Sequence, residues 1–133
     1  MSHRLLFFVF TCAFAAHVQA ADIRVYTDHS ITLQYTKGAQ IVFLDAPRRL
    51  EQDLSAALPA DPKHAEAMAR KRLQTGANLQ RALANAWQGV TDAWARKITH
   101  LPAVVVDGRY VVYGEPDVAK AAARIAAFRS HKP

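Results

Sequence analysis

Few side chains in this sequence have the types and the spacing that chemistry at a protein site requires. The histidines after position 20 are His29, His64, His100 and His131. None has the close His or Cys neighbour that zinc sites use, so only the fold could bring them together. No serine lies in a nucleophile-elbow sequence, and no glycine-rich phosphate loop is present. The sequence therefore predicts no catalytic residue, no metal site and no cofactor.

The only cysteine, Cys12, lies in a segment that we expect to be removed. Residues 1–20 have the parts of a secretory signal peptide: a start with Arg4, an apolar run over residues 5–16, and small residues up to Ala20. That run is shorter than the roughly 20 residues that span a bilayer. We expect cleavage before Ala21, a periplasmic location, and a single domain over residues 21–133. Without Cys12 this domain has no thiol, which excludes disulfide exchange, cysteine proteases and cysteine-ligated zinc.

The charge balance is basic, with 17 Lys and Arg against 11 Asp and Glu and a formal net charge of +6. The densest cluster is Arg70, Lys71 and Arg72, and Lys63 and Arg81 are near it in the sequence. A solvated helix face is the first interpretation, and weak attraction to anionic lipid, cell-wall polymer or an acidic protein is the alternative. Nucleic acid is not an expected partner, because no aromatic residues are interleaved with the cations and no binding motif is present.

The strands that would position these residues follow from short apolar, β-branched runs. Strands are predicted over residues 23–27 and 41–44, and residues 31–35 could form a further short one. Near the C-terminus, two β-rich runs are joined by Asp107 and Gly108. Asp-Gly is typical of a two-residue hairpin turn in which both residues have positive φ.

Helices are predicted between these strands and after the hairpin. Asp45 and Pro47 start a helix that stops at Leu58-Pro59, and a long helical region runs from Asp61-Pro62 to about residue 97 with a break near Gly76. In its second half, large apolar residues three and four apart predict a single stripe facing the core: Leu79, Leu83, Trp87, Val90, Trp94 and Ile98. A last helix should start at Glu115-Pro116, with Val118, Ala121, Ala122, Ile125 and Phe128 on one face.

The order strand, strand, helix, long helical region, hairpin, helix predicts an α/β fold with a small mixed sheet flanked by helices. Pro102 directly before a strand, followed by a hairpin and a closing helix, resembles the C-terminal half of thioredoxin-like proteins. In that fold the corresponding proline is usually cis and lies beside the active site. The resemblance therefore implies a thioredoxin-like domain with a C-terminal β-hairpin and closing helix.

A closer resemblance covers nearly all of residues 21–133. The blocks that carry it are Val25-Tyr26-Thr27-Asp28, Leu44-Asp45-Ala46-Pro47, Leu54-Ser55, Leu58-Pro59-Ala60-Asp61-Pro62, Gly89-Val90, Ala93-Trp94 and residues 97–118. They resemble the exported, thioredoxin-like protein family encoded on bacterial integrating conjugative elements. The resemblance implies an accessory protein of conjugative transfer, associated with a type IV secretion-like apparatus, and it carries no assigned reaction.

The resemblance also indicates where a site would lie. After the first strand, where a redox thioredoxin has Cys-x-x-Cys, this chain has Asp28-His29-Ser30-Ile31. A groove without cysteines could still bind an extended peptide of a partner protein, and its candidate residues are Thr27, Asp28, His29, His100, Leu101 and Pro102.

Three hypotheses about function follow. The first is a non-catalytic periplasmic module that binds another component of a conjugation apparatus through this groove. The second is an enzyme with a cysteine-free polar site, which convergence of Asp28, His29 and His100 would favour. The third is a basic module that binds a membrane or DNA.

Overall fold

The four strands of the protein form one mixed sheet in the computed structural model, which describes residues 20–131. The strands are β1 (Ile23–Thr27), β2 (Ala39–Phe43), β3 (Ala103–Val106) and β4 (Tyr110–Tyr113). Their order across the sheet is β2-β1-β3-β4, with β1 parallel to β2 and antiparallel to β3, and with β3 antiparallel to β4. The expected α/β fold with a small mixed sheet is confirmed, and its arrangement is consistent with a thioredoxin-like protein.

Four helices accompany the sheet: α1 (Ala46–Ser55), α2 (Pro62–Thr75), α3 (Ala77–Ala95) and α4 (Val118–Ser130). The predicted break at Gly76 separates α2 from α3. Helix α1 ends at Ser55, before the Leu58-Pro59 stop. Helix α4 begins later than expected because the Asp117 carboxylate accepts from the Lys120 N–H and so acts as the N-cap.

The hairpin between β3 and β4 has the predicted turn. Asp107 and Gly108 have φ values of 52° and 63°. Both are left-handed, as a two-residue turn of this type requires. The hairpin is therefore confirmed down to its backbone conformation.

The two faces of the sheet are covered differently. On the face that we call the α4 face, Val25 and Val104 pack against Val118 and Ala121 of α4. On the opposite α3 face, Tyr26, Ala103 and Val105 pack against Ala93 of α3. These two clusters form the core.

The segment between β1 and β2, residues 28–38, contains no helix. Instead of a strand over residues 31–35, only Gln34 forms an isolated bridge, with Asp117. Leu33 packs against the core cluster of the α4 face. An extended loop thus occupies the place of the first helix of a thioredoxin-like fold.

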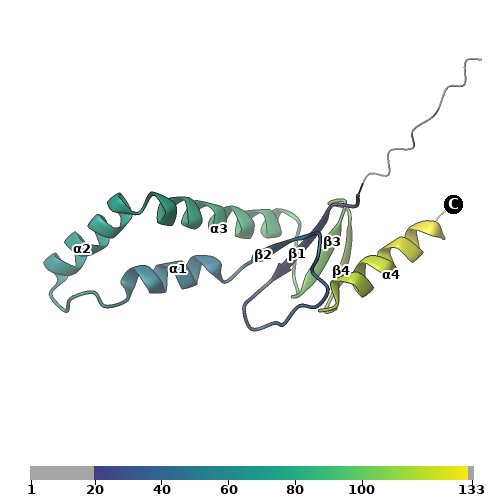
Figure 1. The fold of residues 1–133 in the computed structure, drawn as a ribbon, viewed down its shortest axis with the longest axis horizontal. Coiled ribbons are helices and arrows are strands. Elements are labelled where there is room, and N and C mark those ends of the chain that lie inside the picture. The colour runs from purple at the N-terminus through teal and green to yellow at the C-terminus, as the bar shows by residue number, and fades with distance from the viewer. Residues whose placement is uncertain (1–19, 132–133) are drawn as a thin grey trace, which may run out of the picture.

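Helices α1 and α2 and the first half of α3 project from the sheet as an elongated arm, with α2 at its far end (Figure 1). We call this part the helical arm. Helix α2 has no buried residue, and Pro47 is the only one in α1. Within the described part of the chain, every helix is too short or too polar to span a bilayer. The expected signal peptide lies outside the described residues, apart from Ala20.

The predicted apolar stripe on α3 is wrong for its two tryptophans. Trp87 is 50% exposed and Trp94 is 85% exposed. Helix α3 instead approaches the sheet through small residues: a Cβ built on Gly89 would lie 2.7 Å from Val42 Cγ1, and Ala93 is buried. Because only small side chains allow so close an approach, the two tryptophans lie away from the contact with the sheet. Phe128, expected on the same face of the last helix as Val118 and Ile125, is 60% exposed and meets the ring of Tyr110.

Candidate functional site

The candidate groove residues lie around the end of the sheet where β1 and β2 finish and β3 begins. Thr27, the last residue of β1, is fully buried, and its C=O accepts from Leu44 N–H at 2.8 Å. Tyr26 pairs with Ala103, so the same register places Pro102 opposite Thr27. The Leu101–Pro102 peptide bond is cis, as the resemblance implied.

His29 is held by two residues from β2 and the start of α1. Its Nδ1 lies 2.8 Å from Asp45 Oδ1, and its ring stacks on Phe43 with centroids 4.0 Å apart. Its backbone N–H also donates to Asp45 Oδ2 at 3.4 Å. Burial alone would raise the pKa of Asp45, but the hydrogen bonds from His29 outweigh it and hold that pKa below its usual value.

Asp28 is engaged within its own loop. Its Oδ1 accepts from the backbone N–H of Ser30 at 2.8 Å and also from the Ser30 hydroxyl. This pattern is a local turn closed by an aspartate side chain. The Ser30 hydroxyl therefore donates to Asp28 and not to His29.

His100 lies at the other side of the groove. Its ring meets Tyr113 of β4 edge-on, with centroids 5.9 Å apart, and its Nδ1 is 2.9 Å from the Thr99 hydroxyl. Within residues 20–131, no hydrogen bond or ring contact joins His100 to His29 or Asp28. The three residues that an enzyme site would need to converge here are thus each engaged elsewhere.

Leu101 is the apolar member of the candidate groove. Its side chain is half-buried against the α3-face cluster. No other described residue forms a hydrogen bond with its backbone N–H or C=O. These two polar groups lie where β3 begins, at the end of the sheet, and can pair with an extended chain.

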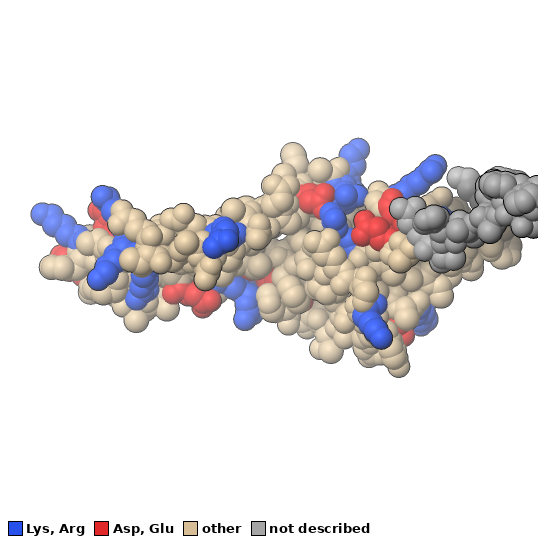
Figure 2. All heavy atoms as spheres, turned by 45° about the horizontal axis from the view of Figure 1, so that its top comes forward, with Lys and Arg blue, Asp and Glu red and all other residues tan. Residues whose placement is uncertain are grey.

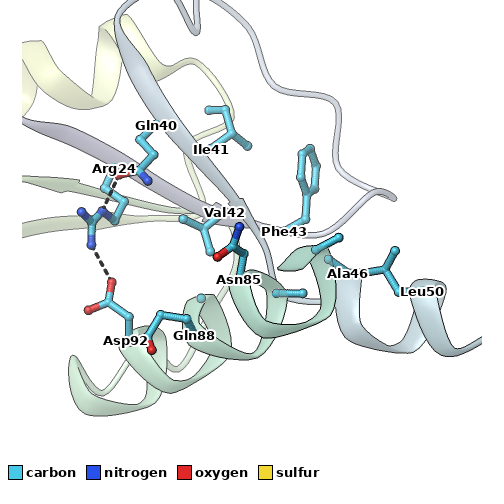
Figure 3. Close-up of a pocket in the computed structure, with 13 residues that line it drawn as sticks. Arg24, Gln40, Ile41, Val42, Phe43, Ala46, Leu50, Asn85, Gln88 and Asp92 are labelled. Carbon is cyan, nitrogen blue, oxygen red and sulfur yellow. Dashed lines mark hydrogen bonds and ion pairs between the residues drawn. The ribbon is translucent and has the colours of Figure 1, made fainter. Parts of the chain in front are cut away.

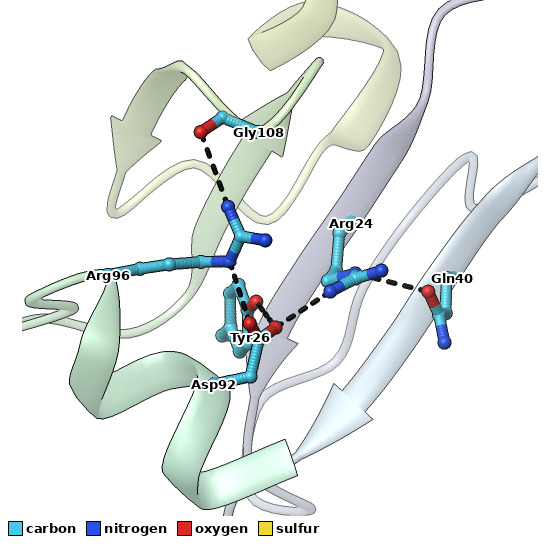
Figure 4. Close-up of polar contacts among 6 residues, drawn as sticks. All are labelled: Arg24, Tyr26, Gln40, Asp92, Arg96 and Gly108. Carbon is cyan, nitrogen blue, oxygen red and sulfur yellow. Dashed lines mark hydrogen bonds and ion pairs between the residues drawn. The ribbon is translucent and has the colours of Figure 1, made fainter. Parts of the chain in front are cut away.

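A polar network behind the groove fixes α3 on the sheet (Figure 4). Asp92 of α3 accepts from Arg24 Nη1 at 2.7 Å, from Arg96 Nε at 3.1 Å, and from the Tyr26 hydroxyl. Burial alone would raise the pKa of Asp92, but these three hydrogen bonds outweigh it and lower the pKa. Burial, followed by the hydrogen bond to Asp92, raises the pKa of Tyr26. The network therefore favours an ionised Asp92 and a neutral Tyr26.

The chemistry open to the groove is limited. A His–Asp pair can orient an imidazole as a general base. His29 and Asp45 have that geometry, but among residues 20–131 no nucleophilic side chain hydrogen-bonds to His29. Within the same residues, no group of three His, Asp or Glu side chains could hold a metal ion.

The basic cluster of α2 is partly used inside the protein. Arg72 donates to the backbone oxygens of Leu54 and Ala56, both at 2.7 Å, and so ties α2 to the end of α1. Arg70 pairs with Glu66 at 2.6 Å. Figure 2 shows the Lys and Arg side chains spread along the helical arm, with Asp and Glu among them. This arrangement agrees with the expected solvated helix face.

Sequence reasoning missed the partners of His29. His29 and Asp45 each lie two residues after the end of their strand, and Thr27 and Phe43 pair in parallel register. Equal offsets after paired parallel strands bring the two side chains to the same place. The equal offsets can be read from the sequence, but they indicate a contact only once the pairing of the two strands is known.

Comparison with known proteins places the chain at the level of a family. The sequence model of a family described as "Protein of unknown function (DUF1525)" matches residues 20–131. No curated protein and no solved structure matches the chain.

Proposed function

The chain belongs to the DUF1525 family of proteins of unknown function, and we propose that it is a non-catalytic binding module. Its ligand is an extended segment of another protein, held beside His29 and Leu101 at the end of the sheet above the buried Thr27. The observation that carries the proposal is the state of Leu101, whose backbone N–H and C=O are left without a described partner while its side chain is half-buried. Such a site offers main-chain hydrogen bonds together with an apolar contact, a local form of the pairing used in strand addition.

The polar residues of the groove support binding rather than turnover. His29 is fixed by Asp45 and Phe43, and Asp28 is fixed by Ser30. Fixed side chains shape a surface, and they do not converge on one point where a reacting atom could sit. The absence of cysteine after residue 20 removes thiol chemistry from the exported chain.

The proposed location and biological role of the protein rest on the sequence resemblance. We propose that the protein is exported to the periplasm and serves as an accessory or assembly protein of an integrating conjugative element. Its partner is then a protein component of the type IV secretion-like transfer apparatus. The blocks that resemble this exported, thioredoxin-like family are spread over nearly all of residues 21–133, and this supports the assignment.

The proposal is tested by a charge placed in the groove. The Leu101→Asp variant keeps Pro102 and adds a carboxylate where an apolar contact is expected. Leu58→Asp is the matched control, because Leu58 is also half-buried but lies on the helical arm. Each tagged protein is captured from cells that carry the neighbouring genes of the element, after urea denaturation has shown that it is folded.

The expected result is that Leu101→Asp binds the partner at least about tenfold more weakly, or by about 1.4 kcal/mol, and so captures less of it, while Leu58→Asp retains capture. Unchanged capture by a folded Leu101→Asp protein would move the interface away from this groove. A steep fall of capture with rising salt in the wild type would instead favour the basic helical arm as the binding surface.

A further inference from the structure

A second candidate site lies on the opposite side of β1 from Leu101. A cavity of about 660 Å³ lies between β2, α1 and α3 (Figure 3). Four consecutive residues of β2 line it, Gln40, Ile41, Val42 and Phe43. Successive side chains of a strand point to opposite faces. A cavity that touches four consecutive residues therefore reaches the open edge of the strand, in addition to the space between the sheet and α3.

The backbone of β2 is open on that side. Strand β2 is the last strand of the sheet, so only β1 pairs with it. Leu44 N–H donates to Thr27 C=O, which fixes the alternation: the backbone groups of Val42 and Leu44 point to β1. The N–H and C=O groups of Ile41 and Phe43 then point outward, along the cavity.

The sequence of β2 lacks the devices that protect an open edge. Ala39-Gln40-Ile41-Val42-Phe43 contains no charged residue, no proline and no glycine. Edge strands in soluble proteins are commonly blunted by lysine, proline or a bulge, because an uncharged edge pairs readily with another chain. An unprotected edge beside a cavity is a template for strand addition.

The far wall of the cavity offers amide groups. Asn85 and Gln88 of α3 line it together with Ala46 and Leu50 of α1. Asn85 is exposed in the middle of α3, where asparagine is a poorer helix former than most residues. No described residue hydrogen-bonds to the Asn85 or Gln88 side chain. Primary amides both donate and accept, and so they match the polar groups of an extended peptide.

The cavity is electrically balanced. Arg24 and Asp92, the only charged residues among its lining side chains, pair with each other at 2.7 Å. Gln40 accepts from Arg24 Nε at 3.1 Å. A charged ligand would find no unpaired counter-charge here, so charge complementarity favours an uncharged one.

We propose that this cavity binds an extended, uncharged segment of a second protein, which adds to β2 as a fifth strand. Its main chain pairs with Ile41 and Phe43. The side chains that face the arm contact Leu50 and the amides of Asn85 and Gln88. The site is separate from the Leu101 groove, since β1 lies between β2 and β3.

The test uses a phage-displayed library of random linear peptides as the probe. The protein purified from the periplasm is the target. The peptides selected on it are synthesised and titrated into the ¹⁵N-labelled wild type, and hydrogen exchange of the Ile41 and Phe43 amides is followed by NMR. Asn85→Arg fills the cavity with a long cation, and arginine is the better helix former, so this variant should fold. Asn78→Arg is the control, since Asn78 is exposed on the same helix outside the cavity.

We expect uncharged peptides that slow exchange of both amides, lose at least about tenfold in affinity for Asn85→Arg, and keep their affinity for Asn78→Arg. Leu101→Asp should bind them like the wild type, which separates this site from the proposed function. The proposal is overturned if no peptide is enriched, or if the peptides bind Asn85→Arg equally well or leave both amides unprotected. A dimer in analytical ultracentrifugation that Asn85→Arg dissociates would assign the edge to a second copy of the chain, and that too would overturn it.

Discussion

Asp45 shows how a single residue can serve a site at the expense of a helix. It is the N-cap of α1, where an aspartate side chain normally accepts from the backbone N–H groups of the first turn. Here it makes no such bond, and both carboxylate oxygens accept from His29 instead. The loop after β1 is thereby fastened to the start of α1. A side chain that leaves its helix uncapped in order to orient a histidine is consistent with a shaped binding groove.

The prediction at the scale of single residues concerns Asp92. Asp92→Asn removes the carboxylate that accepts from Arg24, Tyr26 and Arg96, and it should lower the free energy of unfolding by about 2 kcal/mol at pH 7. The pKa of Asp92 is lowered in the folded protein, so its stabilisation is complete above the unfolded-state pKa of about 3.9. It is lost as the pH falls through the lower, folded-state pKa.

Urea denaturation of both proteins between pH 7 and pH 2 checks this prediction. The difference in free energy of unfolding between wild type and Asp92→Asn should shrink at acidic pH. Protonation of Asp92 there removes the charge from the wild type, and the variant lacks this charge at every pH. A difference that stays constant down to pH 2 would mean that the charge of Asp92 contributes nothing.

At the scale of elements, α3 is the part of the molecule that connects the arm to the sheet. Gly89 and Ala93 place it against Val42 and the Tyr26 cluster, and Arg96 donates to the Gly108 C=O of the hairpin turn at 3.2 Å. Small residues set how closely the helix approaches the sheet, and the charged residues set its end. Both kinds of contact depend on partners far away in the sequence.

Gly89→Ala tests the close approach. Alanine should favour the helix by about 1 kcal/mol. Its Cβ, however, would lie 2.7 Å from Cγ1 of Val42, a side chain with little rotamer freedom, and overpacking of this kind costs about 1–3 kcal/mol. We expect a net loss of about 1 kcal/mol in chemical denaturation.

Val42→Ala serves as the partner in a double-mutant cycle. The double variant should be more stable than the sum of the single effects by about 1 kcal/mol. If Gly89→Ala alone stabilised the protein, the helix would have room that the structure does not give it.

The difference between local and long-range contacts explains which parts of the structure could be predicted from the sequence. The Asp-Gly turn, the break at Gly76 and the start of α2 at Asp61 and Pro62 follow from local chemistry, and the structure confirms them. The prediction for the tryptophans of α3 is wrong because periodicity shows which residues share a helix face. It does not show which of the faces packs closely against the sheet. The amides beside β2 carry no local signal at all, since they matter only once β2 is known to be an edge.

At the scale of the whole molecule, burial is unequal. The most deeply buried side chains lie in the sheet and in α4, among them Val25, Tyr26, Val104 and Val118, while α2 buries none. The helical arm is held by half-buried residues and by bonds such as those from Arg72 to the end of α1. A protein built this way presents a stable sheet with two open edges and a less stable arm beside one of them.

Export is the prediction that concerns the whole chain. N-terminal sequencing of the protein from a periplasmic fraction should begin at or within a few residues of Ala21, and Ala20→Arg should leave the precursor uncleaved. An intact Met1 in the membrane fraction of the wild type would contradict the signal-peptide assignment.

The hairpin turn has a consequence for how the chain can be rebuilt. Asp107 N–H donates to the Asp22 C=O at 2.8 Å, its Oδ1 accepts from Asp22 N–H at 3.1 Å, and its Oδ2 accepts from Arg129 Nη1 at 2.7 Å. One residue thus holds the start of β1 and the last turn of α4 at the same pole of the domain. A short glycine-serine linker can therefore join residue 22 to residue 130 in a circular permutant, with new ends opened at the exposed Gly38. Reporter domains fused at residues 22 and 130 would both leave from this pole.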